Sequence, residues 1–283
     1  MKKIVDLQKL QSVVFAAKRD GKTIALVPTM GYLHAGHISL VQAAQAKADI
    51  TIVSIFVNPS QFNNPEDFTN YPKDLQADCK ILEEQQVDIV FIPTAEAMYP
   101  QGKMGIQIRI ESLMQNLCAT TRPGHFEGVL TIICKLFHLS QPDHAFFGKK
   151  DYQQYLLVKR LAEELSFPVS VEGVDTLRES DGLAMSSRNA RLDTELRKAA
   201  SLIPRAYNFV NKHWKSGERD IKTLRAIFAE VVLTSPHIEI DYLEAVDPYT
   251  LEEKTSDDVS EFILATAIFV GKVRLIDNQL FSI

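Results

Sequence analysis

The chain has 283 residues, of which 46% are hydrophobic and 24% are charged, as is usual for a soluble globular protein. That length favours one large domain with a second, smaller one. Thirty-one lysines and arginines against 36 aspartates and glutamates give a formal net charge of -5. Extended binding to DNA or RNA is therefore disfavoured, and an anionic ligand would need a local cluster of positive groups.

The cysteines and the apolar runs disfavour secreted and membrane proteins. Cys79, Cys118 and Cys134 are too few and too widely spaced for a disulfide framework or a zinc knuckle, which favours a reducing compartment. Polar residues interrupt the N-terminal stretch MKKIVDLQKLQ, so it does not resemble a signal peptide. The longest apolar run, FILATAIFV, is far shorter than the ~20 residues that span a bilayer. We therefore predict a cytoplasmic protein with neither a membrane nor a nucleic-acid partner.

Short apolar runs alternate with helical patterns through residues 1–176. Because they are continuously apolar and rich in β-branched residues, the runs predict strands buried on both faces. The predicted strands lie over 23–28, 50–57, 87–93, 144–148 and 169–174, and the predicted helices over 37–48, 74–86, 129–139 and 151–165. This alternation is typical of right-handed βαβ crossovers. We predict an α/β domain with a doubly wound, Rossmann-like parallel sheet over residues 1–176.

The C-terminal third has a different order of elements. Helical patterns over 194–213 and 220–233 precede predicted strands over 238–246, 262–270 and 273–283. Helices followed by adjacent strands indicate a small α+β domain. We predict this second domain over residues 177–283, with a hinge in the polar segment 176–190.

The stretch VPTMGYLHAGHISLV carries two histidines where the first predicted strand gives way to a helix. In a doubly wound fold, ligands bind beyond the carboxyl ends of the strands. His34 and His37 would share one face of the first helical turn, beside unpaired backbone N–H groups and the positive end of the helix dipole, and Gly36 leaves room for a nucleotide. This place suits phosphate. A buried structural histidine and half of a metal site are the alternatives, but the chain has no H-E-x-x-H and offers no third nearby zinc ligand.

Several motifs together carry a family resemblance. HAGH resembles the H-x-G-H signature of a nucleotidyltransferase superfamily that includes class I aminoacyl-tRNA synthetases. With VSIFVNPSQF, RPGHFEGV, FFGKKDYQQ and DGLAMSSRN, in that order over residues 22–190, and RLIDN near the end, the chain is similar to the pantothenate synthetase family. The resemblance implies a homodimeric ligase that joins pantoate to β-alanine. It implies MgATP as co-substrate, an enzyme-bound pantoyl-adenylate, and release of AMP and pyrophosphate.

The expected ATP site combines the helix start with two later segments. MSSRN places two hydroxyls and a guanidinium on a loop, and these groups suit phosphates. By resemblance, this loop is the counterpart of a K-M-S-K-S loop. The alternative is a helix cap for the segment that starts near Thr194. Lys150 follows a predicted strand. The resemblance implies that Lys150 contacts the ATP phosphates, and the alternative is that it lies on a solvated face. The implied catalytic residues are His34, His37, Lys150, Ser186, Ser187 and Arg188. The implied ATP-binding residues are Pro28, Thr29, Met30, Gly36, His37, Gly148, Lys150, Asp151, Met185, Ser186, Ser187 and Arg188.

The expected pantoate site follows the second predicted strand. Neutral amides and an aromatic ring in FVNPSQF suit a small hydroxylated substrate, although a loop amide is commonly only a turn residue. The resemblance implies that Gln61 and Gln154 bind pantoate oxygens, with Met30 and Phe62 against its methyl groups. Contacts to β-alanine or other groups are assigned to Asn58 and Arg122.

Three positions leave local questions open. Cys118 occupies a position where the family usually carries Glu, and Lys149 one where many members do. Asp78 is a candidate magnesium-linked carboxylate, with a solvated acid as the alternative. No Walker phosphate loop and no G-x-G-x-x-G occur, so phosphate binding must depend on the segments above.

The rival functions fit the chain less well. A nucleotidyltransferase acting on another small acceptor would need further cations where this chain has Gln61 and Phe62. A tRNA synthetase would need a large anticodon-reading region. For a regulatory module that binds ATP without turnover, Cys118 and Lys149 are the only features in favour, and the intact histidine pair and Lys150 count against it. The ligase reaction needs no general base in its first step, because a carboxylate is already ionised at neutral pH.

Overall fold

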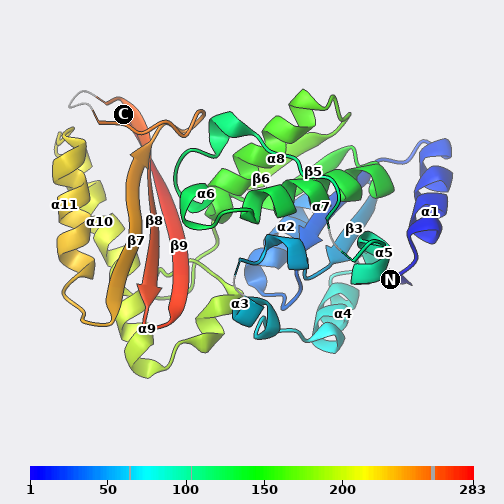
Figure 1. The fold of residues 1–283 in the computed structure, drawn as a ribbon, viewed down its shortest axis with the longest axis horizontal. Helices are drawn as coiled ribbons and strands as arrows, with labels where there is room; N and C mark the ends of the chain where they lie inside the picture. The colour runs from blue at the N-terminus through cyan, green and yellow to red at the C-terminus, as the bar shows by residue number, and fades with distance from the viewer. Residues whose placement is uncertain (64, 103, 256–258) are drawn as a thin grey trace. The chain divides into compact units, whose positions relative to one another are not determined.

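The structure is a computed structural model that describes residues 1–63, 65–102, 104–255 and 259–283 (Figure 1). The chain forms two compact units. Unit 1 comprises Met1–Ile110, Arg122–Lys149 and Gln154–Asp175, and unit 2 comprises Glu111–Thr121, Lys150–Gln153 and Thr176–Ile283. Two short segments thus belong to the unit that holds the C-terminal third, although they lie within the first 176 residues.

Unit 1 contains a parallel sheet whose strand order, among the described residues, is β1-β4-β3-β2-β5-β6. The strands are β1 (Lys2–Ile4), β2 (Ile24–Thr29), β3 (Ile50–Ile55), β4 (Ile89–Phe91), β5 (His144–Gly148) and β6 (Ser170–Val174). All neighbours pair in parallel, which confirms the doubly wound α/β sheet. The strand order reverses between β2 and β5. Such a reversal point is where open α/β sheets bind ligands, beyond the carboxyl ends of the strands.

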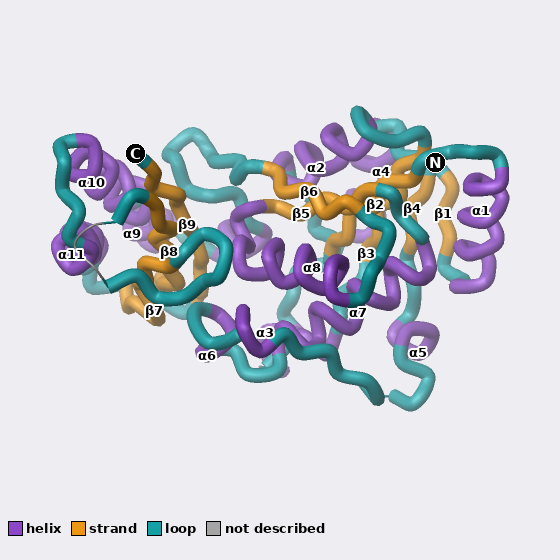
Figure 2. The backbone as a smooth tube through the Cα atoms, turned by 90° about the horizontal axis from the view of Figure 1, so that it is seen from above, coloured by secondary structure: helices purple, strands orange, loops and turns teal. Residues whose placement is uncertain are grey.

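Helices cover both faces of this sheet. Among the described residues, the helices of unit 1 are α1 (Leu7–Arg19), α2 (Ala35–Gln45), α3 (Pro65–Thr69), α4 (Leu75–Glu84), α5 (Ala95–Met98), α7 (His125–Ser140) and α8 (Tyr152–Glu164), which begins in the Lys150–Gln153 segment. Neighbouring strand residues point to opposite faces, yet Leu26 and Val27 are both fully buried. Val27 packs in one cluster with Val41 of α2 and Leu82 of α4. Figure 2 shows these two helices on one side of the sheet and α7 on the other.

The sequence patterns did not predict two elements at the start of the chain, β1 and α1. Strand β1 has only three residues, too few for a recognisable apolar run. Helix α1 does carry a stripe, because Leu10, Val14 and Ala17 recur at helical spacing and are buried. Asp6 caps it by accepting a hydrogen bond from the Lys9 N–H at 2.7 Å.

Unit 2 is an α+β layer, as predicted. Strands β7 (Ile238–Val246), β8 (Glu261–Val270) and β9 (Val273–Ser282) form an antiparallel sheet in that order. The helices are α6 (Cys118–Thr121), α9 (Thr194–Ala200), α10 (Leu202–Lys215) and α11 (Ile221–Val232). The single helix expected over 194–213 is two helices that meet at Ser201. Pro204 explains the break, because it has no N–H to donate to the carbonyl of Ala200.

Helices α10 and α11 pack their apolar stripes against this sheet. The stripe of α10 consists of Ile203, Tyr207, Val210 and Trp214, and that of α11 of Leu224, Phe228 and Val232. Both join one core with the strand residues Phe262, Leu264 and Ile268. Within the described part of the chain, no helix is long and apolar enough to cross a membrane.

Candidate active site

The two histidines cap helix α2 reciprocally. The helix begins at Ala35, so His34 is its N-cap residue and His37 lies in the first turn. The His34 Nδ1 accepts a hydrogen bond from the Gly36 N–H at 3.1 Å, and the His37 Nδ1 accepts one from the His34 N–H at 3.3 Å. Two of the N–H groups at the helix start thus have side-chain partners.

This cap determines where each imidazole carries its proton. Because each Nδ1 offers a lone pair to a backbone N–H, the ring proton must be on Nε2. The ring centroids lie 4.1 Å apart, with the planes tilted by 42°. Both side chains are part-exposed rather than buried in the core. In each ring the N–H is therefore on Nε2, beside the helix start at the carboxyl end of β2, and an N–H suits an anionic oxygen better than a metal ion.

Asp78 shapes the loop that leads to the histidines. Its Oδ2 accepts the Tyr32 N–H at 2.8 Å, and its Oδ1 accepts the Leu33 N–H at 2.7 Å. A Cβ at Gly31, which has φ +82°, would lie 2.8 Å from the Asp78 Oδ2, so only glycine fits there. Asp78 is 2% exposed, so a solvated acid is the wrong description of it.

This geometry gives the suggested magnesium role of Asp78 no support. Both carboxylate oxygens already accept backbone hydrogen bonds. Among the described residues, no group of three or more His, Cys, Asp or Glu side chains could hold a metal ion. The donor set therefore does not fit a metal site built by the protein, and we assign no step to a metal ion held by Asp78.

A buried chain of hydrogen bonds orients Asn58 and Gln61 after β3. The Tyr99 hydroxyl donates to the Asn58 Oδ1 at 2.8 Å, and the Asn58 Nδ2 donates to the Gln61 Oε1 at 3.2 Å. Burial raises the pKa of Tyr99, which keeps its hydroxyl protonated as a donor. The Gln61 Nε2 then points to the Met30 Sδ, 3.1 Å away. Gln61 therefore presents an N–H donor on the Met30 side, which suits a substrate oxygen.

Helix α7 presses closely on the short 3₁₀ helix η1 (Pro59–Gln61), which holds Gln61 in place. A Cβ at Gly128 would lie 2.4 Å from the Ser60 carbonyl oxygen, so this approach requires glycine. Arg122 lies 2.9 Å from the His125 Nε2, and the His125 Nδ1 lies 2.7 Å from the Gln61 carbonyl oxygen. Arg122 therefore reaches the Gln61 segment in two ways, through His125 and by donating from its Nη2 to the Gln61 carbonyl at 3.4 Å.

Other predicted residues of unit 1 lie at the ends of strands or in aromatic contacts. Pro28 and Thr29 end β2, where the Thr29 hydroxyl donates to the Ser54 carbonyl at 2.8 Å. The Phe62 ring makes edge contacts with Phe68 and Tyr71. Gly148 ends β5, Gly36 lies in the first turn of α2, and Gln154 lies in α8. In the described part of unit 1, the structure thus brings Met30, Asn58 and Gln61 together.

Lys150 lies in the 3₁₀ helix η3 (Lys149–Asp151), directly after β5. Its side chain is 18% exposed, and its Nζ lies 3.8 Å from the Asp151 Oδ2, which fits an orienting role for Asp151. Its carbonyl accepts a hydrogen bond from the Asn278 Nδ2 at 2.9 Å. Lys149 pairs instead with Asp175 at 2.8 Å, with both side chains well exposed. Of the two lysines, Lys149 is the one on a solvated face.

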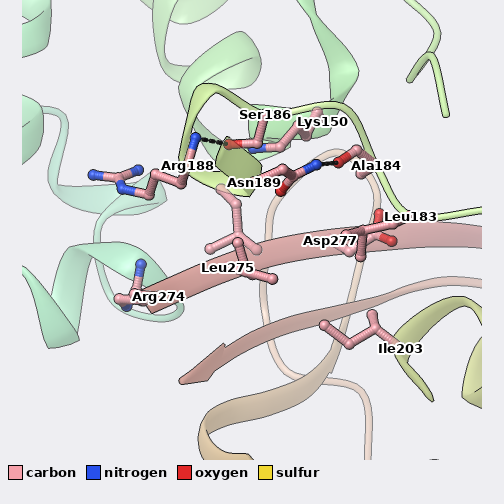
Figure 3. Close-up of a pocket in the computed structure, with 11 residues that line it drawn as sticks. Lys150, Leu183, Ala184, Ser186, Arg188, Asn189, Ile203, Arg274, Leu275 and Asp277 are labelled. Atoms are coloured by element: carbon pink, nitrogen blue, oxygen red, sulfur yellow. Dashed lines mark hydrogen bonds between the residues drawn. The ribbon is translucent and has the colours of Figure 1, made fainter. Parts of the chain in front are cut away.

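The Ser-Ser-Arg loop forms one wall of a pocket in unit 2. The pocket is lined by Lys150, Ser186, Arg188 and Asp277, among others (Figure 3). The Ser186 Oγ accepts the Arg188 N–H at 3.2 Å and caps the 3₁₀ helix η4 (Ser187–Arg191). Ser186 is therefore a helix cap, but it caps η4. The helix that begins at Thr194, which the alternative interpretation named, is capped by Asp193 instead.

Cys118 lies in a polar cluster of unit 2. Its Sγ is 3.3 Å from the Tyr242 hydroxyl and 3.6 Å from the Arg274 Nη2. Arg274 also donates to the Asp241 Oδ2 from both Nη2 and Nε, at 2.6 and 3.0 Å. Burial, with Cys118 beside it, raises the pKa of Tyr242 well above its ordinary value. The Cys118 thiol therefore packs against the guanidinium of Arg274.

Sequence reasoning missed four residues that support the predicted site: Tyr99, Asp78 in its loop-shaping role, Arg178 and Asp277. Each acts through a partner more than 20 positions away in the chain, and no local spacing indicates such a contact. The stretch RLIDN, which contains Asp277, was the available signal for one of them.

Comparisons with known proteins identify relatives of this chain. A sequence profile described as Pantoate-beta-alanine ligase matches residues 2–280. The chain is 49% identical over 276 residues to the pantothenate synthetase of Leptospira biflexa (strain Patoc 1 / Ames), which covers 98% of this chain and 97% of the relative.

Solved structures show the same fold. The pantothenate synthetase of Thermus thermophilus superposes with a TM-score of 0.90 at 39% identity, covering 99% of both chains. A Francisella tularensis pantoate-beta-alanine ligase, solved with beta-gamma ATP and beta-alanine, superposes with a TM-score of 0.80 at 33% identity, covering 99% of this chain and 97% of the relative. The chain therefore belongs to the pantoate-beta-alanine ligase family.

Proposed function

We propose that this chain carries out the ATP-dependent ligation of its family in two steps. The pantoate carboxylate attacks the α-phosphorus of ATP, which forms pantoyl-adenylate and releases pyrophosphate. The amine of β-alanine then attacks the acyl carbonyl, which forms pantothenate and releases AMP. The observation that carries this proposal is the reciprocally capped histidine pair at the carboxyl end of β2, because its tautomers make both Nε2 atoms donors.

His34 and His37 would bind phosphate oxygens in the first step. Negative charge builds on the phosphates as pyrophosphate leaves, and fixed N–H donors stabilise such charge without reorganising. The start of α2 adds its positive dipole end. Charge-assisted hydrogen bonds of this kind contribute roughly 1.5–3 kcal/mol each.

Lys150, Ser186, Ser187 and Arg188 would bind the phosphates that become pyrophosphate. Lys150, Ser186 and Arg188 line one pocket, and Arg188 can contact two phosphate oxygens at once. The remaining assignments to ATP are Pro28, Thr29, Met30, Gly36, Gly148, Asp151 and Met185. In the first step these cations would stabilise the negative charge that builds on the departing pyrophosphate.

Pantoate would be bound by Gln61 and Gln154 through its oxygens and by Met30 and Phe62 through its methyl groups. The buried contacts of Asn58 support this assignment, because they turn the N–H groups of Gln61 toward Met30. Asn58 and Arg122 are the proposed contacts for β-alanine or for other groups of the substrates. The Francisella tularensis relative was solved with beta-gamma ATP and beta-alanine, which supports these two molecules as ligands here.

Four further features stay predictions. ATP would enter as its Mg²⁺ complex, with the ion held chiefly by phosphates and water, as Mg²⁺ prefers. The division after residue 176 into a nucleotide- and pantoate-binding domain and a C-terminal lid would protect the water-sensitive adenylate. A homodimer and a cytoplasmic location complete the expectation.

Isotope exchange tests the proposed route. The purified full-length chain should exchange labelled pyrophosphate into ATP when MgATP and pantoate are present and β-alanine is absent. Omitting pantoate should abolish this exchange, because the carboxylate is the nucleophile of the first step. Exchange that requires β-alanine, or that proceeds without pantoate, would rule out a pantoyl-adenylate formed before the amine reacts.

A further inference from the structure

The proposed phosphate-binding residues of unit 2 are attached to strand β9 through two neighbouring side chains. Asp277 and Asn278 are consecutive residues of β9. Asp277 binds Arg178, which belongs to the segment that leads into the Ser-Ser-Arg loop. Asn278 binds the backbone of Lys150. Two segments more than 25 residues apart in the chain thus meet at one place on the sheet.

The contact of Asp277 with Arg178 is a two-point ion pair. The Arg178 Nη1 donates to the Asp277 Oδ2 at 2.7 Å, and the Arg178 Nη2 donates to the Asp277 Oδ1 at 3.0 Å. The Asp277 side chain is 2% exposed and that of Arg178 is 32% exposed. Two parallel hydrogen bonds fix direction as well as distance, which a single contact would not do.

The same guanidinium holds a short hairpin that ends at the loop. Arg178 pairs with Ala184 in an antiparallel bridge, and its Nη1 also donates to the Gly182 carbonyl at 3.1 Å. The Met185 N–H donates to the Leu177 carbonyl at 3.0 Å and closes the hairpin. Ser186 is the next residue. A shift of Arg178 would therefore be passed along the backbone to Ser186.

Further bonds join the hairpin to the 3₁₀ helix η4, so that the two move together. The Asn189 Nδ2 donates to the Glu179 Oε1 at 2.5 Å and to the Ala184 carbonyl at 3.0 Å. Arg197 donates to Glu179 and to Asp181. The loop thus has a stiff base, and the Asp277 ion pair attaches that base to β9. Figure 3 shows Asp277 on β9 beneath the loop.

An ion pair of this kind is weak evidence for a contribution to stability. Replacing a buried ion pair by apolar side chains of similar volume is often neutral or stabilising, whereas such pairs can specify one arrangement among several. Misplacing a contacting group by about 1 Å can lower a reaction rate by about 100-fold. A pair that fixes a phosphate-binding loop in direction therefore bears directly on turnover.

We propose that Asp277 and Asn278 are positioning residues for the ATP phosphates. Asp277 sets the place of Ser186 and Arg188 through Arg178 and the hairpin, and Asn278 sets the place of Lys150 through its carbonyl. This inference rests on the proposed function of Lys150, Ser186 and Arg188.

The test is a steady-state comparison of full-length variants, with MgATP and pantoate varied separately. Asp277→Asn should raise the KM for MgATP by about 10-fold or more and lower kcat, because a misplaced loop binds the phosphates poorly. The KM for pantoate should stay within about 2-fold, since Gln61 and its buried contacts lie in unit 1. Asn278→Ala should raise the KM for MgATP by about 3- to 10-fold.

Matched controls come from the same unit. Asp247→Asn alters another ion-paired carboxylate, 2.9 Å from the Lys254 Nζ. Asn116→Ala removes another amide that donates to a backbone carbonyl, that of Leu251, at 2.8 Å. Both controls should leave the two KM values unchanged.

If Asp277→Asn does not fold, the double variant R178M/D277L replaces the pair by apolar side chains. It should fold and show the same selective rise in the KM for MgATP. The proposal is overturned if the Asp277 and Asn278 variants leave the KM for MgATP unchanged, or if the KM values for pantoate and MgATP rise equally. Lys150→Ala tests the underlying assignment separately, because normal kinetics in that variant would refute the proposed role of Lys150 in binding the ATP phosphates.

Discussion

The reciprocal cap allows the two roles of His34 to be separated by substitution. Its Nδ1 accepts the Gly36 N–H at 3.1 Å, while its Nε2 is the proposed donor to phosphate. In His34→Asn, the Asn Oδ1 can replace the Nδ1, because Asn is among the best N-cap residues. The shorter side chain has no counterpart of the Nε2–H. His34→Ala removes both groups.

The magnitudes follow from these two contacts. Losing the cap in His34→Ala should lower the free energy of unfolding by about 0.5–2 kcal/mol. Losing a charge-assisted hydrogen bond, at about 1.5–3 kcal/mol, should lower kcat by roughly 10- to 150-fold in both variants. His34→Asn should therefore be nearly as stable as the unmodified chain and nearly as inactive as His34→Ala.

Urea denaturation and pantoate-dependent pyrophosphate exchange measure the two quantities. If His34→Asn keeps full exchange activity, Nε2 is not a phosphate donor. If it loses as much stability as His34→Ala, the cap through Nδ1 is not the contact that matters. Either result would refute the reasoning from tautomers.

The remaining predictions concern Tyr99 and the pH dependence of stability. Tyr99→Phe removes the 2.8 Å hydrogen bond to the Asn58 Oδ1 and should raise the KM for pantoate by about 3- to 10-fold with the KM for MgATP unchanged, whereas Tyr207→Phe, which removes another buried hydroxyl, should change neither. Although burial opposes it, hydrogen bonds from Arg197 and Asn189 hold the pKa of Glu179 below its ordinary value of 4.5. The stabilisation from Glu179 is thus complete above pH 4.5 and is lost as the pH falls through the lowered pKa. The difference in unfolding midpoint between the unmodified chain and Glu179→Gln should therefore shrink in that pH range. A difference that stays constant would contradict the lowered pKa.

Local sequence patterns were sufficient to predict the strands that position the candidate site. The apolar runs before His34, Asn58 and Lys149 correspond to β2, β3 and β5 within one or two residues. A buried parallel strand has no solvent face, so its sequence is continuously apolar and easy to recognise. The order of these strands along the chain then implied a shared edge for the residues that follow them.

Local patterns did not indicate how those residues are held. Asp78 looked like a surface acid at helical spacing, because nothing near it in the sequence shows that it accepts two backbone N–H groups from the loop before His34. Asp277 likewise sits in an ordinary strand, and its partner Arg178 lies 99 positions away. Both Arg178 and Asp277 could have been read as solvated charges.

By itself, the sequence determined the fold class, the alternation of strands and helices, and the position of the histidine pair at the start of a helix, because all three depend on neighbours within a few residues. Only the tertiary structure decided how the Tyr99 hydroxyl orients the amides of Asn58 and Gln61, and how the Ser-Ser-Arg loop is attached to β9. These depend on hydrogen bonds between segments that the fold brings together. Such bonds leave no periodic trace in the chain, since one donor and one acceptor are sufficient for each.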